Sequence, residues 1–228
     1  MLFSSAIAAN AIRRFKSTCR SFSKRMATMT IMHEPHLVEE SSLIVLAGRM
    51  HKENSMERGN GLQHKRVIVL GGSSGIGLEV AKQAASQGAS VVIASSSAER
   101  VEKAVESVGG EAQGQAVDVS DERAVATFFS KLGTFDHLVF TAGDSLHLHD
   151  LAVTDLQQAR HAFELRYWAA LAAVKYGCPH IRKEGSIVLT TGIAGQRPLK
   201  GWVIAASVCG TIEALTRALA VELAPIRV

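Results

Sequence analysis

The stretch that decides the fold is Arg66-Val67-Ile68-Val69-Leu70-Gly71-Gly72-Ser73-Ser74-Gly75-Ile76-Gly77. Its apolar first half predicts a strand buried on both faces, and its glycines lead into a helix expected over 75–87. A G-x-x-x-G-x-G turn between a strand and a helix places a pyrophosphate at the helix N-terminus. There, unpaired backbone N–H groups and the helix dipole favour negative charge. The residues expected to form this cradle are Gly71, Ser73, Ser74, Gly75, Ile76 and Gly77.

Downstream of this loop, short β-branched runs alternate with longer helical stretches. Strands are predicted at 66–70, 90–95, 112–117, 137–141 and 186–191, with a sixth beginning at 226–228. Helices are predicted at 75–87, 98–108, 154–176 and 203–223, together with one capped by Ser120. This alternation requires right-handed crossovers and predicts an α/β fold, a Rossmann-type doubly wound parallel sheet in three α/β/α layers. Because the chain ends within the sixth strand, we expect the domain to be C-terminally incomplete.

The basic charge of the chain is concentrated near its N-terminus. Six of the 25 Lys and Arg residues lie before Glu34, where there is no acid; the remainder carries 19 basic against 21 acidic residues, a net charge of −2. A near-neutral body lacks the positive patch that nucleic acid requires, so no nucleic-acid partner is expected. Segment 1–33 is Arg- and Ser-rich and resembles an organelle-targeting presequence, for a mitochondrion or a plastid. The alternatives are a disordered basic tail and a cytoplasmic form that starts at Met26.

The rest of the composition indicates an ordinary globular protein. Apolar residues make up 47% and charged residues 20% of the chain. No run reaches the 18 continuous apolar residues of a membrane span, so no membrane partner is expected. Cys19, Cys178 and Cys209 lack metal-ligand spacing, which indicates reduced thiols and no metal site. We assign 34–62 to a linker and 63–228 to an NAD(P)-binding Rossmann domain.

Three motifs in sequence order resemble those of the short-chain dehydrogenase/reductase family. Gly71 to Gly77 is similar to the family's TGxxxGIG loop, Asp118-Val119 to its adenine-contacting Asp, and Thr141-Ala142-Gly143 to its NNAG turn. The resemblance spans 65–228 and implies a nicotinamide dinucleotide bound by these residues. It also implies an oxidoreductase acting on carbonyl or alcohol groups of a small-molecule substrate. A homo-oligomer is expected only for a chain that carries the family's further C-terminal strand.

The end of the second strand bears on the choice of cofactor. An acid at this point accepts a hydrogen bond from the ribose 2′-OH and repels a 2′-phosphate. This chain instead has Ser95, Ser96 and Ser97, and its first acid there is Glu99. Since serine hydroxyls tolerate a phosphate, NADP(H) is favoured over NAD(H). Arg100 either pairs with that phosphate or is an ordinary solvated charge on its helix.

The family's catalytic residues are missing at the positions where the resemblance places them. It implies a Ser at the end of the fifth strand, a Tyr 13 residues later and a Lys four residues beyond, which together pass a proton as hydride moves. An Asn lies in the preceding long helix. Those positions fall on four other residues, in the order Gly192, Ala205, Cys209 and Arg166.

Three residues are weak candidates to replace the missing groups. Arg166 can hold an anionic group but cannot usefully donate a proton. Thr191 is next to the Ser position but faces the other side of an ideal strand. His147, in the loop after the Thr141 turn, is a candidate acid, although exposed loop histidines are common. The sequence leaves two functions open: an NADP(H)-dependent oxidoreductase with a non-standard active site, or a non-catalytic dinucleotide-binding pseudoenzyme or interaction module.

Overall fold

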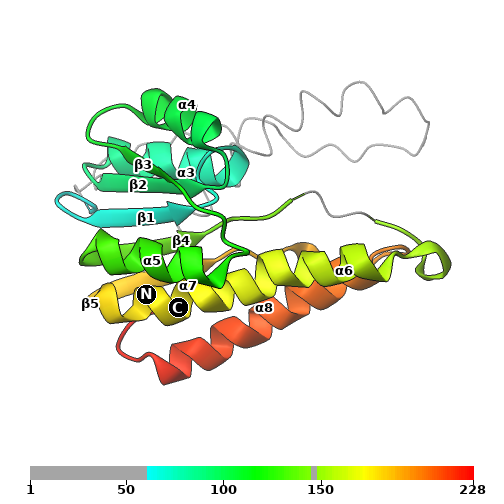
Figure 1. Cartoon of the computed structure of the whole chain (residues 1–228). Coiled ribbons are helices and arrows are strands. Elements are labelled where there is room, and N and C mark those ends of the chain that lie inside the picture. Colours follow the sequence, from blue (N-terminus) through cyan, green and yellow to red (C-terminus); the bar gives the residue numbers. More distant parts are fainter. Residues whose placement is uncertain (1–60, 145–147) are drawn as a thin grey trace, which may run out of the picture.

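The structure of the protein is a computed structural model that describes residues 61–144 and 148–228 (Figure 1). The expected presequence, all but the last two residues of the expected linker, and the candidate acid His147 lie outside the described residues. The side chain of Leu62 is only 7% exposed and packs in the core. The folded domain therefore begins slightly inside the range that we assigned to the linker.

Five parallel strands form one sheet in the order β3-β2-β1-β4-β5, which confirms the predicted fold class. Their bounds are β1 Arg66–Leu70, β2 Ser90–Ser95, β3 Gln113–Ala116, β4 Phe135–Phe140 and β5 Ile181–Leu189. The winding reverses between β3 and β4, so the switch point of the sheet lies at the carboxyl ends of β1 and β4, where such sheets bind ligands. Arg227 forms a parallel bridge with Ser186 of β5, where the sixth strand was expected to begin.

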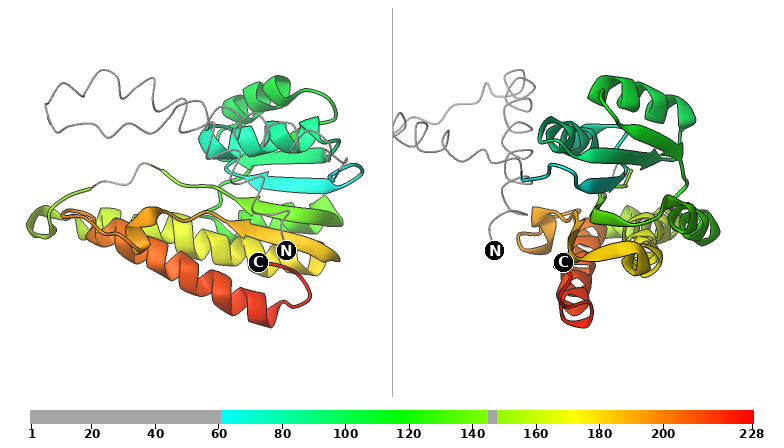
Figure 2. Two further views of the ribbon diagram at one scale, coloured as in Figure 1. Left: turned by 180° about the vertical axis from the view of Figure 1, so that it is seen from behind. Right: turned by 90° about the vertical axis from the view of Figure 1, so that its left-hand side faces the viewer.

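Helices cover both faces of the sheet (Figure 2). Their bounds are α3 Gly75–Ser86, α4 Ala98–Val108, α5 Glu122–Leu132, α6 Leu156–Phe163, α7 Ala169–Gly177 and α8 Val203–Glu222. Successive strand residues alternate between the two faces. Val67 and Val69 pack with α3 and α4, whereas Ile68 and Leu70 belong to the larger core formed with α5, α7 and α8.

The single long helix predicted over 154–176 is interrupted. After α6 the chain makes a π-helical segment, η2 Glu164–Trp168, before α7 continues. A π turn inserts an extra residue and changes the direction in which the following side chains point, and such turns are frequent at functional sites. The apolar period of the sequence runs through this segment without a break, so the pattern did not reveal it.

The residue that caps α5 also differs from the prediction. Asp121, not Ser120, is the N-cap, and its carboxylate accepts hydrogen bonds from the N–H groups of Arg123 and Ala124. Ser120 instead donates its hydroxyl to Asp118. Both residues are good N-caps, and the one nearer the first turn takes the position.

Among the described helices, α8 alone has the length and hydropathy of a membrane span: it has 20 residues, and an 18-residue window of it has a mean hydropathy of 1.4. Ile212 and Leu219 of this helix are buried in the larger core. Only 28% of the apolar window is buried inside the domain. A single helix of this length and composition is weak evidence for a membrane span, because core helices of α/β domains share both properties.

Candidate cofactor site

The glycine loop after β1 is locked against the turn that follows β4. Gly71 has φ +83°, and a Cβ added there would lie less than 3.0 Å from the backbone of Ala142. A Cβ at Gly77 would be equally close to the carbonyl oxygen of Gly71 and to Thr141 Oγ1. Thr141 Oγ1 donates to the carbonyl oxygens of Leu70 (3.0 Å) and Gly71 (3.2 Å). The loop therefore has one tightly packed side, toward β4.

The other side of the loop is open above the N-terminus of α3. Gly75 has φ +53°, and a Cβ there would meet no atom within 4 Å. Ser74, the N-cap, makes no side-chain hydrogen bond to the first turn, which contains no acid. The N-caps of α4, α5 and α6 do make such bonds, through Ser97, Asp121 and Asp155. Helix α3 thus leaves its N–H groups and dipole for an external anion, and a pyrophosphate fits this cradle.

Serine hydroxyls lie on the side of the switch point toward β2. Ser73 Oγ in the glycine loop donates to Ser95 Oγ at the end of β2, over 2.9 Å. Ser96 is exposed, and Ser97 Oγ accepts from the N–H of Arg100 (3.3 Å) as the cap of α4. This edge therefore presents hydroxyl groups and no carboxylate at the end of β2.

Asp118 follows β3 on the same side of the sheet. Its Oδ1 accepts from the N–H (2.9 Å) and the hydroxyl (2.7 Å) of Ser120. These bonds hold the pKa of the Asp118 carboxyl below its usual value, so the residue is an exposed anion at neutral pH. Its neighbour Val119 is buried in the core and fixes the turn.

On the other side of the glycine loop, the turn after β4 ends in an ion pair. Arg166 Nη1 lies 2.5 Å from Asp144 Oδ1, and Arg166 Nη2 donates to the backbone oxygen of Asp144. Arg166 belongs to the π-helical segment, and its side chain is 17% exposed. The sequence pointed to Arg166 but missed Asp144; the only signal for it was an acid directly after the Thr141-Ala142-Gly143 turn.

The three residues that the resemblance places at the family's Ser, Tyr and Lys positions, Gly192, Ala205 and Cys209, come together in the structure. A Cβ at Gly192 would lie 3.2 Å from Cys209 Sγ. Ala205 and Cys209 are 5% and 8% exposed and form a small apolar cluster against which Trp202 packs. No side chain among these three positions can act as a phenolic acid or as an ammonium group.

Of the other two weak candidates, Thr191 and His147, only Thr191 is described by the structure. Thr191 Oγ1 donates to the backbone oxygen of Cys209 (3.2 Å), so its hydroxyl is bonded to α8. Among the described residues, no group of three or more His, Cys, Asp or Glu side chains could hold a metal ion. His147, as noted, is not described.

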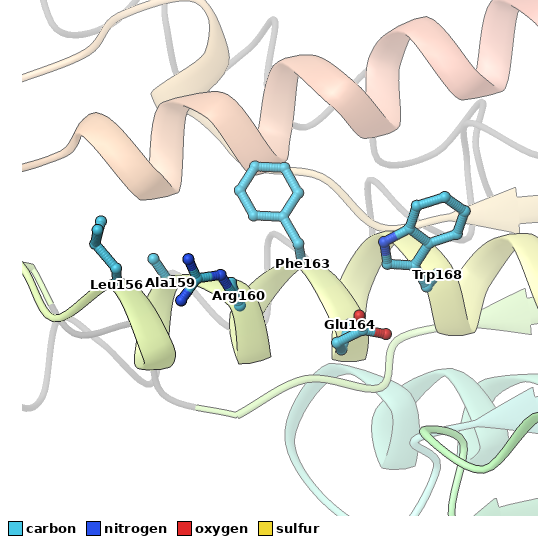
Figure 3. Close-up of a pocket in the computed structure, with 6 residues that line it drawn as sticks. All are labelled: Leu156, Ala159, Arg160, Phe163, Glu164 and Trp168. Carbon is cyan, nitrogen blue, oxygen red and sulfur yellow. The ribbon is translucent and has the colours of Figure 1, made fainter.

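A separate hollow of about 280 Å³ lies beside α6 and the π-helical segment. Figure 3 shows Phe163 and Trp168 projecting from the same side of the helix there. Its lining residues are Leu156, Ala159, Arg160, Phe163, Glu164 and Trp168. None of them is a residue of the glycine loop or of the turns after β2, β3 and β4, so this hollow is not the candidate dinucleotide site.

Residues 65–228 match the sequence model of a known family, described as short chain dehydrogenase. The chain belongs to the short-chain dehydrogenase/reductase family. Short-chain dehydrogenase/reductase ATR9 of Stachybotrys chlorohalonatus is 35% identical over 182 residues, covering 73% of this chain and 72% of that protein. As a family member, the chain is expected to bind a nicotinamide dinucleotide, and the open cradle above α3 fits one.

Solved structures of the family resemble this fold. A small-chain dehydrogenase in complex with NADPH is 36% identical, with a TM-score of 0.62, covering 73% of this chain and 68% of that one. An NAD⁺-bound xylitol dehydrogenase is 27% identical, with a TM-score of 0.71, covering 74% of this chain and 69% of that one. Relatives of this fold thus carry either dinucleotide, and the choice in this chain depends on its own residues.

Proposed function

We propose that this member of the family is an NADP(H)-binding oxidoreductase that acts on carbonyl or alcohol groups through a non-standard active site. The observation that carries the cofactor choice is the Ser73–Ser95 hydrogen bond. It places two hydroxyls at the end of β2, where a carboxylate would repel a 2′-phosphate. The small-chain dehydrogenase solved with NADPH supports the same choice by similarity.

The chain's own residues divide the work of binding. The first turn of α3 would hold the pyrophosphate, the serines at β2 would hold the adenosine ribose, and Asp118 would contact the adenine. When bound, the nicotinamide supplies or accepts the hydride. Gly192 and Ala205 carry no titratable group, and Cys209 offers a thiol in place of an ammonium group. Losing a positioned acid costs about 10² to 10⁴ in rate. We therefore infer either slow turnover or a substrate that is already activated.

The second candidate function is a non-catalytic dinucleotide-binding module. The observation that favours it is the apolar cluster of Ala205 and Cys209, which fills the positions of the family's acid with carbon and sulfur. A panel of aldehydes, ketones and quinones with NADPH separates the two. Measurable, saturable turnover supports the oxidoreductase, and binding without turnover on any of the panel supports the module.

Substitution of Ser95 by Asp tests the cofactor choice. The new carboxylate would repel a 2′-phosphate and accept from a 2′-hydroxyl, so NADPH affinity should fall at least about tenfold while NADH affinity is kept or gained. Ser107→Asp, which adds the same charge on the exposed side of α4, is the matched control. Unchanged preference in Ser95→Asp, measured by calorimetric titration, would contradict the assignment.

A further inference from the structure

The turn after β4 is held from two sides that lie far apart in the sequence. Its first residue, Thr141, bonds to the end of β1 and to the glycine loop. Its last described residue, Asp144, is bound by Arg166 through both its carboxylate and its backbone oxygen. The turn therefore connects the glycine loop with the π-helical segment.

The guanidinium of Arg166 also packs against Gly143. A Cβ added at Gly143 would lie 3.1 to 3.4 Å from Nη2, Cζ and Nε of Arg166. Such contacts are tighter than most side chains make, so a larger residue at 143 would push the guanidinium away. Because a guanidinium is planar and donates in fixed directions, the contacts with Gly143 and Asp144 define the position of that backbone.

The strand order shows which half of a dinucleotide this turn faces. Ser95 and Asp118 end β2 and β3 on one side of β1, whereas the turn ends β4 on the other side. A dinucleotide bound at the switch point has its pyrophosphate at α3. If its adenosine half were held over β2 and β3, its nicotinamide half would be held over β4, beside Ala142 and Gly143.

We propose that Asp144 and Arg166 form a clamp that positions the Ala142–Gly143 backbone for the nicotinamide half of the cofactor; the inference rests on the proposed dinucleotide binding. In this role Arg166 is a positioning residue. Asp144 already neutralises its charge at 2.5 Å, so binding of an anionic substrate would first have to displace that carboxylate. The π-helical segment is the local structure that carries the guanidinium to this turn.

The test compares two ligands, of which only one has the nicotinamide half that would be held over β4. NADPH contains both halves, whereas 2′,5′-ADP contains only the adenosine side. We expect Arg166→Ala to weaken NADPH binding about tenfold, because it removes both bonds to Asp144 and the packing against Gly143. Asp144→Ala should weaken it less, since the bond from Arg166 to the backbone oxygen of residue 144 remains, and the double variant should bind no more weakly than Arg166→Ala. Binding of 2′,5′-ADP should stay within about twofold of wild type.

Two further variants complete the comparison. Arg166→Lys keeps a cation for the Asp144 carboxylate and should retain most of the NADPH affinity. Lys175→Ala breaks an exposed ion pair with Glu122 (3.0 Å) on α5 and α7 and should change neither affinity. All variants are titrated at the same pH, because His161 Nε2 lies 3.9 Å from the other carboxylate oxygen of Asp144.

The outcomes separate the clamp from the function on which it rests. If wild type binds neither ligand, the proposed dinucleotide binding is itself wrong. If wild type binds NADPH but the single variants match it, or their effects add in the double variant, the clamp is refuted. Loss of both ligands in Arg166→Ala would also refute it, since that result indicates damage to the whole domain.

Discussion

Two glycines of the same loop should lose different amounts of stability on the same substitution. A Cβ at Gly77 would lie less than 3.0 Å from the Gly71 carbonyl oxygen and from Thr141 Oγ1, and both atoms are fixed. Overpacking of this kind costs about 1 to 3 kcal/mol, and disturbing the Thr141 hydrogen bonds adds about 1 kcal/mol. We expect Gly77→Ala to destabilise the domain by about 2 to 4 kcal/mol.

Gly75→Ala provides the matched comparison. Its Cβ would meet no atom within 4 Å, so the cost is the positive φ of +53°, about 1 kcal/mol. For a chain of this size, a change of 1 kcal/mol shifts Tm by about 2 to 4 °C. Gly77→Ala should therefore lower Tm by about 4 to 16 °C and Gly75→Ala by only about 2 to 4 °C.

Cofactor titration of the same two variants completes the assay. A methyl group at Gly75 stands on the open side, where a phosphate would approach the backbone, so Gly75→Ala should lose at least tenfold in NADPH affinity despite its near-normal Tm. Equal Tm values for the two variants would refute the loop packing described here. Wild-type NADPH affinity in Gly75→Ala would refute the placement of the pyrophosphate.

Two predictions concern polar groups of β4, the partly buried His137 and the buried Asp136. Burial lowers the pKa of His137, whose Nδ1 lies 2.9 Å from Ser186 Oγ. The neutral imidazole therefore contributes fully to the stability of the domain above its ordinary pKa near 6.5. That contribution is lost as the pH falls from this value toward the lower pKa of the folded state. His137→Gln should flatten the decrease in unfolding free energy between about pH 7.5 and 5.5, and an unchanged slope would refute this. Asp136, whose side chain is 4% exposed, accepts a hydrogen bond from Arg182 (2.8 Å), so Asp136→Asn should lower the free energy of unfolding by about 1.5 to 3 kcal/mol, measured in urea. Glu99→Gln, which breaks the exposed pair with Lys103, should lower it by under about 0.5 kcal/mol. Equal losses in the two variants would contradict this prediction.

The sequence was sufficient for the parallel sheet and for the glycine loop. Local signals determined both: apolar runs such as 67–70, and glycine spacing that requires a strand before it and a helix after it. The ends of the strands were predicted less accurately. β4 begins at Phe135, two residues before the prediction, because Asp136 is a buried acid that breaks the apolar pattern and is stabilised by cations from outside the strand.

The parts of the site that depend on tertiary contacts could not be predicted. Nothing near Asp144 in the sequence indicates that Arg166, 22 residues away, binds it, and the π turn that allows the contact leaves no mark in the apolar period. The Ser73–Ser95 hydrogen bond likewise joins two elements separated by a whole helix. The sequence supplied the residue types, and the crossover between β1 and β2 brought them together.

The most direct test is a calorimetric titration of a Trp168→Phe variant and of the wild-type chain with NADPH and with NADH, followed in parallel by tryptophan fluorescence, which in the variant comes from Trp202 alone. Trp202 packs against the cluster of Ala205 and Cys209, so it reports on the catalytic positions as well. We expect both dinucleotides to bind saturably, NADPH more tightly than NADH. If neither NADPH nor NADH binds, the loop at Gly71–Gly77 is not a functional dinucleotide site.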